Sequence, residues 1–228
     1  MSLISTTNKN NKPRKRDLTK SSLIIASAKA FSLYGYHNTT IAQIAQLAGV
    51  TERTFYRYFS SKEGTILDEI TRLNDLFLSL LNEQPDSIEI LDAVDRVLSE
   101  MNPRYGMASS TMLVISQGGF DDQLAKDLAR ISWLYEEQLQ AELEKRITKS
   151  FPYIDAEEAR VSSIALSRAI SGGIRFALLE CAQSGIEEAT KSPLFMQSYR
   201  RFIGVYERSL RMRPTPIDTP VSSSSGQY

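Results

Sequence analysis

The sequence of 228 residues predicts an all-α fold, in which a small N-terminal domain with a helix-turn-helix is followed by a larger helical domain. Three observations support this prediction. Apolar residues recur at helical spacing along most of the chain, strand-like alternation is almost absent, and glycines or capping residues lie where helical segments end or begin. With 42% hydrophobic residues, a chain of this length can bury a hydrophobic core.

The first two helices are predicted by one apolar face each and by a glycine after each. The first helix ends at Gly35, and its apolar face consists of Leu23, Ala26, Ala30 and Phe31. A short second helix follows Thr40 and stops at Gly49, and its face consists of Ile41, Ile44, Ala45 and Ala48. Because this glycine permits a tight turn, the next helix can pack at a steep angle, as in a helix-turn-helix.

Capping residues predict the third and fourth helices. Thr51 is the expected N-cap of the third helix, with Glu52 in its first turn. Ser60 and Glu63 have the spacing of a capping box, so a fourth helix should open there and the third should span only about two turns. The apolar face of the fourth helix consists of Ile66, Ile70, Leu73 and Phe77.

The remainder of the chain also predicts helices, near 87–101, 107–117 and 122–149. The face of the long helix consists of Leu124, Leu128, Ile131 and Tyr135. Asp155 and Glu158 repeat the capping-box spacing before a helix that runs to about residue 184. Ser192 and Pro193 suit the N-cap and first turn of a last helix, whose stripe is Phe195, Tyr199, Phe202, Tyr206 and Leu210.

These signals divide the chain into four parts. We expect a disordered basic arm over 1–17, a helix-turn-helix domain over 18–64, a helical domain over 65–213 and a disordered tail over 214–228.

Composition argues against several classes of function. The single cysteine, Cys181, cannot form an internal disulfide, and together with the single histidine, His37, it leaves too few ligands for a zinc site. No Gly-rich phosphate loop occurs, so we expect no cofactor, no metal and no enzymatic activity. The sequence has no apolar run of membrane-spanning length and no signal-peptide core, so a cytoplasmic location without membrane contact is expected.

The formal net charge of zero conceals an asymmetry along the chain. Residues 1–63 contain ten Lys or Arg and three Asp or Glu, a charge of +7, whereas residues 64–228 carry −7. Since a local field steers a charged partner, the basic N-terminal part is a candidate for nucleic-acid binding. Chance clustering of solvated charges is the alternative.

The third helix divides its side chains between two roles. On a helical wheel, Phe55 and Phe59 point inward, and Arg53, Thr54, Tyr56 and Arg57 fall on the outer half, with Tyr58 on the flank. The phenylalanines would anchor the helix, while the outer side chains would reach phosphates and base edges. Core packing of all four aromatic rings is the alternative, but it does not explain arginines beside a tyrosine.

Residues 19–70 resemble the DNA-binding module of the TetR (tetracycline-repressor-like) family of bacterial regulators. The resemblance is based on "FSLYGYHNTT", "IAQLAGVT", the Thr-Phe-Tyr of the third helix and "YFSSKE". It implies DNA-backbone contacts by Thr40, Thr51, Tyr56 and Lys62. It implies base-edge contacts by Arg53, Thr54 and Arg57, and a further polar contact by Tyr58. The basic arm, with Lys12, Arg14, Lys15 and Arg16, would add DNA contacts or act as a solvated tail.

In the resembled family a divergent helical domain supplies a dimer interface and an effector pocket. Small residues on the penultimate helix, together with the aromatic stripe of the last helix, suit a two-helix dimer face; these are Ala165, Ala169, Gly172 and Gly173. Packing within one chain is the alternative. The candidate ligand contacts are Met101, Tyr105, Met112, Phe120, Arg130, Trp133, Arg175 and Phe176, although core packing would also explain most of them.

The predicted function is that of a dimeric, sequence-specific DNA-binding transcriptional regulator, a repressor released from a palindromic double-stranded operator by a small-molecule effector. The alternative is a DNA-organising protein with the same DNA-binding domain and no effector. Activation in place of repression depends on where the operator lies relative to a promoter.

Overall fold

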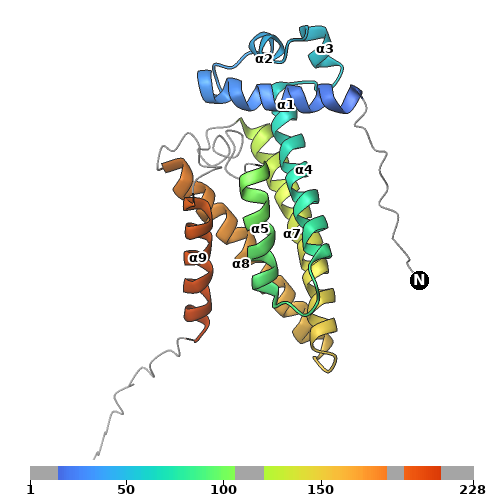
Figure 1. Cartoon of the computed structure of the whole chain (residues 1–228), viewed down its shortest axis with the longest axis vertical. Coiled ribbons are helices and arrows are strands. Elements are labelled where there is room, and N and C mark those ends of the chain that lie inside the picture. Colours follow the sequence, from blue (N-terminus) through green and yellow to red (C-terminus); the bar gives the residue numbers. More distant parts are fainter. Residues whose placement is uncertain (1–14, 106–120, 184–192, 212–228) are drawn as a thin grey trace, which may run out of the picture.

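The computed structural model describes residues 15–105, 121–183 and 193–211, and every regular element in these ranges is an α-helix (Figure 1). The order is α1 (Lys15–Tyr34), α2 (Ile41–Leu47), α3 (Glu52–Tyr56), α4 (Lys62–Glu83), α5 (Ile90–Tyr105), α7 (Asp122–Ser150), α8 (Ala156–Gln183) and α9 (Leu194–Arg211). The all-α prediction is confirmed. The helix predicted near 107–117 lies outside the described residues, as do residues 1–14 of the predicted arm and the tail predicted over 214–228. Lys15, Arg16 and Asp17 belong to α1, so the prediction of a disordered arm is wrong at these three residues.

Helices α1, α2 and α3 form a head that lies across the N-terminal end of α4 (Figure 1). Gly35 and Gly49 end the first two helices with φ angles of 76° and 67°, values that favour glycine. Thr40 forms a capping box with Gln43 at the start of α2. The core of the head consists of Leu23, Ile24, Ala26, Ala30, Ile44, Phe55 and Phe59.

Helix α4 begins one residue later than the capping-box spacing predicts. Its N-cap is Ser61, which has extended backbone angles and makes no side-chain hydrogen bond to the backbone, and Ser60 is exposed. The prediction of Ser60 as the cap is therefore wrong. The turn after α3 carries the chain one residue further before helical geometry starts, and adjacent serines do not distinguish the two positions. Helix α9 begins at Leu194, so Pro193 precedes its first helical residue.

Helices α4, α5, α7, α8 and α9 form an elongated body with one main core (Figure 1). Arg146 on α7 is 5% exposed and donates hydrogen bonds to the carbonyl oxygens of Leu81 and Gln84 at the end of α4. The Gln84 N–H also donates to the Leu81 carbonyl oxygen at the C-cap of α4, and a cation suits the negative end of the helix dipole. Arg146 therefore caps α4 from another helix.

Replacement of Arg146 by methionine is expected to lower the free energy of unfolding by about 1–3 kcal/mol. Methionine retains much of the apolar volume but removes the Arg146 donor from the carbonyl oxygens of Leu81 and Gln84. Urea denaturation measures the change, and Arg130→Met, at an exposed position of the same helix, is the control. Equal midpoints for the two variants would contradict the capping role.

The small residues of α8 accommodate α9 of the same chain. A Cβ atom at Gly173 would lie 3.0 Å from two ring atoms of Tyr199, and one at Gly172 would lie 3.4 Å from Phe202. Packing within one chain therefore explains both glycines. Ala169 and Gly173 are buried, Gly172 is half-buried and Ala165 is exposed, so Ala165 is the most open of the four small residues to a second copy.

Candidate nucleic-acid interface

Helix α3 has five residues, too few to be stable alone, and two buried phenylalanines hold it on the head. Phe55 is fully buried and Phe59 is 6% exposed, with their ring centroids 5.8 Å apart. The Thr51 hydroxyl accepts a hydrogen bond from the Thr54 backbone N–H at 3.3 Å and caps the helix. The N-cap and the inward face predicted for this helix are confirmed.

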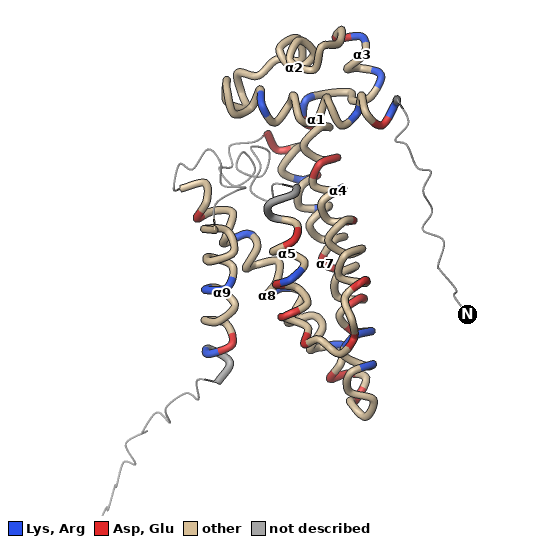
Figure 2. Tube along the Cα trace, viewed as in Figure 1, with Lys and Arg blue, Asp and Glu red and all other residues tan. Residues whose placement is uncertain are grey.

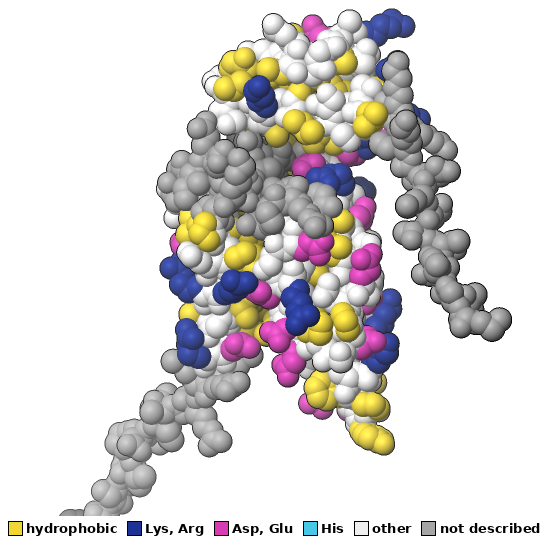
Figure 3. Space-filling model, in the orientation of Figure 1, with side chains coloured by type: hydrophobic (Ala, Val, Ile, Leu, Met, Phe, Trp, Pro, Cys, Tyr) yellow, Lys and Arg dark blue, Asp and Glu magenta, His cyan; other side chains and the backbone are white. Residues whose placement is uncertain are grey.

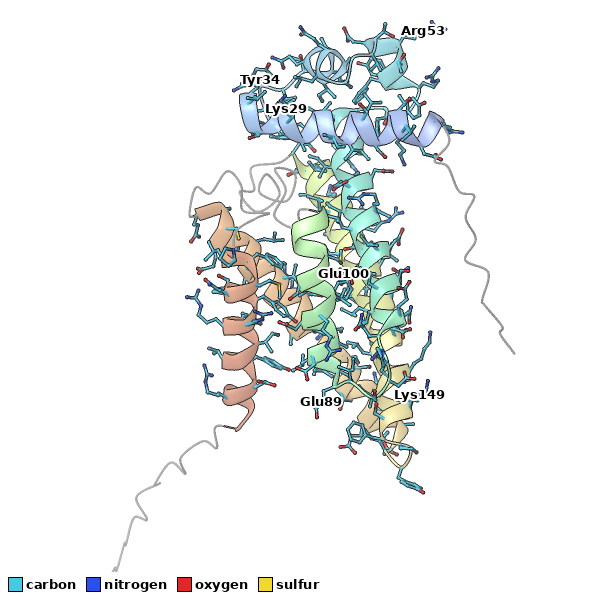
Figure 4. All side chains as sticks on the ribbon, in the orientation of Figure 1. Lys29, Tyr34, Arg53, Glu89, Glu100 and Lys149 are labelled. Atoms are coloured by element: carbon cyan, nitrogen blue, oxygen red, sulfur yellow. The ribbon has the colours of Figure 1, made fainter. Side chains whose placement is uncertain are left out.

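The opposite side of α3 is open to solvent. Arg53, Tyr56 and Arg57 are exposed, and the Tyr56 side chain is 55% exposed although its ring contacts that of Phe55 edge-on. Arg53 points away from the body (Figure 4). Along the head, Lys and Arg outnumber Asp and Glu, although both α1 and α3 also carry an acidic residue, whereas the body mixes both signs of charge throughout (Figures 2 and 3). A helix with this division can place cations and a phenol against a polyanion while its apolar side stays buried.

Tyr58 lies beside Arg57. The Arg57 guanidinium is 5.2 Å from the centroid of the half-buried Tyr58 ring, a cation–π distance. Tyr58 also packs against the head core, so it can restrict the directions that Arg57 adopts. Thr54 is half-buried, and its hydroxyl lies 3.1 Å from that of Thr51.

Lys62 has a different position from the one expected of a phosphate contact. Its ammonium group donates to the carbonyl oxygens of Tyr36, His37 and Thr39, at 2.6, 3.3 and 3.0 Å. It also lies 4.5 Å from the Tyr36 ring centroid. An ammonium has three donors, so these carbonyl oxygens leave none for a phosphate. Lys62 therefore joins the loop before α2 to the start of α4.

A second contact strengthens this joint between head and body. The Tyr36 hydroxyl donates a 2.9 Å hydrogen bond to Glu63, and burial followed by the Glu63 carboxylate raises the pKa of Tyr36. For Glu63, burial opposes ionisation, but hydrogen bonds from Ser61, its own backbone N–H and Tyr36, with the charge of Lys62, lower its pKa below 4.5. The apolar part of the joint consists of Phe31, Ile66 and Leu124, with Tyr36, Leu67, Ile70 and Leu128 packed around them.

Acid is expected to weaken this joint. A carboxylate with a lowered pKa stabilises the folded state above its unfolded pKa, and this contribution is lost as the pH falls through the folded value. Glu63→Gln should therefore show a smaller fall in melting temperature than the unaltered chain between about pH 6 and about pH 3. Glu89→Gln, at the distal end of the body (Figure 4), is the control. The same fall in both variants would exclude Glu63 as an acid-sensitive contact.

The predicted ligand contacts do not converge. Met101 is fully buried in the core, Arg130 is exposed, and Trp133 is 61% exposed on α7. Phe176 packs against Phe202 of α9, with ring centroids 5.6 Å apart. Met112 and Phe120 lie outside the described residues, and the side chain of Tyr105 is likewise not described. Arg175 is the one member of the set found at the cavity in the described part of the body.

That cavity lies between α4, α7 and α8 and has a volume of about 160 Å³. Its apolar wall consists of Ile70, Leu73, Phe77, Leu128, Ile174 and Leu178. Several of these residues were expected only as helix faces, because helical spacing marks a buried side without showing where packing is incomplete. Ile70 and Leu128 also belong to the joint between head and body.

Neither a metal-binding cluster nor a membrane-spanning helix occurs among the described residues. No group of three or more His, Cys, Asp or Glu in residues 15–105, 121–183 and 193–211 is arranged to hold a metal ion. Within the same ranges, no helix combines the length and apolarity needed to cross a membrane.

A short exposed helix presented by a helix-turn-helix head on a helical body defines the class of helix-turn-helix regulators. Residues 23–68 match the family described as "Bacterial regulatory proteins, tetR family". The chain is 37% identical over 81 residues to the HTH-type transcriptional regulator TcmR of Streptomyces glaucescens, covering 36% of each protein. It is 30% identical over 115 residues to RutR of Escherichia coli (strain K12), covering 48% of this chain and 54% of RutR. It thus spans less than two thirds of either relative.

Solved structures share the fold over most of the chain. The fatty acid degradation regulator FadR from Bacillus halodurans has a TM-score of 0.60 at 19% identity, covering 90% of this chain and all of FadR. FadR from Bacillus subtilis, solved in complex with stearoyl-CoA, has a TM-score of 0.51 at 19% identity, and the match covers 80% of this chain and 95% of that FadR. Residues 23–68 thus match the tetR family of regulators, and the chain shares the fold of these solved structures.

Proposed function

We propose that the chain is a dimeric repressor that binds a palindromic operator through α3 and is released by a small-molecule effector. The observation that carries this proposal is the division of α3 into a buried Phe55–Phe59 side and an exposed side with Arg53, Tyr56 and Arg57. Such a helix fits the major groove of DNA, which admits an α-helix and displays a distinct pattern of hydrogen-bond donors and acceptors for each base pair.

The proposed DNA contacts fall into two groups. Thr40, Thr51 and Tyr56 contact phosphates, and Arg53, Thr54 and Arg57 face base edges. Tyr58 supports Arg57 through its ring and adds a polar contact from its hydroxyl. Lys62 acts indirectly, because it fixes the loop that leads into α2.

Two copies are needed because one five-residue helix reads few base pairs. A two-fold dimer places its recognition helices about one helical turn of DNA apart, so each copy reads one half-site. The exposed sides of α8 and α9 offer the contact surface, where Val161, Ala165, Leu179 and Val205 are exposed.

The cavity is the proposed effector site. Ile70 and Leu128 belong both to its wall and to the joint below the head, so a ligand that moves them also changes how the head is held. A ligand that binds more tightly to a conformer with wrongly spaced recognition helices lowers operator affinity. The complex of the Bacillus subtilis FadR with stearoyl-CoA supports ligand binding in this fold. A DNA-organising protein without an effector would need no such cavity.

Selection of bound DNA from a random pool tests the proposal. We expect a palindrome with half-sites about one helical turn apart, and an affinity that falls steeply with added salt. Retention of no DNA at low ionic strength would remove the DNA-binding function, and an asymmetric single site would remove the dimer.

Tyr56→Phe is expected to weaken binding to all operator variants by about 0.5–1.5 kcal/mol per half-site. The substitution removes only the hydroxyl that would contact a phosphate, so base preference should not change. Fluorescence anisotropy with a small operator panel measures this. Tyr34→Phe, at the other end of the head (Figure 4), is the control, and a matching loss there would argue against a specific Tyr56 contact.

A further inference from the structure

The size of the cavity between α4, α7 and α8 limits what it can hold, if it is the effector site proposed above. Its volume is about 160 Å³. An engineered cavity of about 150 Å³ in another protein, lined by Leu, Ile and Phe, binds benzene. The cavity volume therefore matches about one aromatic ring.

The wall favours an aromatic ligand. Phe77 and Tyr135 meet edge-to-face in it, with ring centroids 6.0 Å apart and an interplanar angle of 77°. Aromatic pairs of this geometry extend readily to a third ring, because each edge finds a face. The aliphatic side chains around them, including Leu73 and Ile174, add apolar contact, and Asn74 and Ser132 also line the wall.

A hydroxyl without a partner lies in the same wall. The hydroxyl groups of Ser163 and Ser167 on α8 donate hydrogen bonds to backbone carbonyl oxygens of the same helix, at 2.7 and 3.0 Å. The Ser171 hydroxyl, one turn further, is buried and has no hydrogen-bond partner among the described residues. A buried hydroxyl without a partner costs free energy, and a ligand oxygen in the adjacent cavity would satisfy it.

The charged residues of the wall neutralise each other. Arg175 and Glu136 form a 3.2 Å ion pair, and both line the cavity. A ligand carboxylate at Arg175 would also meet the negative charge of Glu136, and a ligand ammonium at Glu136 would also meet the positive charge of Arg175. An uncharged ligand leaves the pair intact and avoids the desolvation of a third charge.

From these observations we infer that the cavity binds a small, uncharged aromatic compound with one hydrogen-bonding oxygen, of the phenol class. The ring packs against Phe77 and Tyr135, and the oxygen pairs with the Ser171 hydroxyl. The Glu136–Arg175 pair favours an uncharged ligand over charged ligands of the same size.

Titration calorimetry of the full-length chain with phenol, toluene, benzoate and benzylammonium tests this inference. We expect phenol to bind at least about tenfold more tightly than either charged probe. Ser171→Ala, which removes only a hydroxyl without a partner, should remain folded. It should weaken phenol about 3- to 10-fold and leave toluene within about twofold. Glu136→Gln should raise benzoate affinity, because Arg175 then lacks its partner.

Three results would overturn the inference: no probe binds, a charged probe binds more tightly than phenol, or Ser171→Ala weakens phenol and toluene equally. A parallel titration of the operator complex separates this inference from the proposed function. Phenol that binds without lowering operator affinity would remove the effector role and leave the ligand class standing. A chain that binds operator DNA but none of the probes would remove the ligand class and leave the DNA-binding function standing.

Discussion

Replacement of Phe55 by alanine is expected to destabilise the head by about 3–5 kcal/mol and to abolish operator binding. Phe55 is fully buried, and its ring contacts those of Tyr56 and Phe59, both at 5.8 Å between centroids. The cavity left by the ring removes the main attachment of a helix that has only five residues. The body has its own core, so it should remain folded.

Urea denaturation followed by circular dichroism, together with operator titration, measures both effects. Phe151→Ala is the matched control, because the Phe151 side chain is 60% exposed between α7 and α8 and its loss should change neither quantity. Operator binding that survives in Phe55→Ala would mean that α3 is held by other contacts or does not read DNA.

The head could be predicted from the sequence because its signals are local. Gly35, Gly49 and Thr51 each act within a few residues, and the structure confirms the turns and the cap that they predict. The wrong prediction of Ser60 as the N-cap of α4 also rests on a local signal. Two adjacent serines suit the cap equally well, and the path of the chain after α3 selects Ser61.

The remaining differences come from contacts between residues distant in sequence. Lys62 donates hydrogen bonds to the carbonyl oxygens of residues that lie 23 to 26 positions earlier. Its spacing from α3 in the sequence could not show that its donors are occupied. Gly173 is opposed by Tyr199 of the same chain, which the stripe of small residues could not distinguish from a second copy. The cavity combines α4 with α8, about 100 residues apart, and only packing shows where the apolar faces leave space.

The cavity and the head share one structural element. Ile70 is one turn of α4 beyond Ile66, and both contact the cluster that includes Phe31 of α1. A phenol-sized ligand thus needs no long path to influence the head, because a shift of Ile70 is already a shift in the surface on which α1 rests. Such a coupling needs two discrete arrangements of the joint with different affinity for the ligand.

Arg57→Ala is expected to flatten base preference at one step of each half-site, at a cost of about 1–3 kcal/mol per half-site. In a symmetric dimer both copies lose the contact, so the total against the selected operator is about 2–6 kcal/mol. The guanidinium lies 5.2 Å from the Tyr58 ring centroid, so it is partly oriented before DNA arrives. A guanine offers two hydrogen-bond acceptors to a guanidinium group, whereas the alanine side chain has no donor for them.

Random-pool selection with the variant distinguishes reading of a base from attraction to the backbone. If Arg57 reads a base, the motif of Arg57→Ala loses one position per half-site and keeps the others. If Arg57 contacts only a phosphate, all sequences weaken together and the salt dependence becomes shallower, because one fewer counterion is released per half-site. Lys29→Ala removes the same charge from an exposed position at the other end of α1 (Figure 4), so an unchanged motif there shows that lost charge alone does not alter base preference.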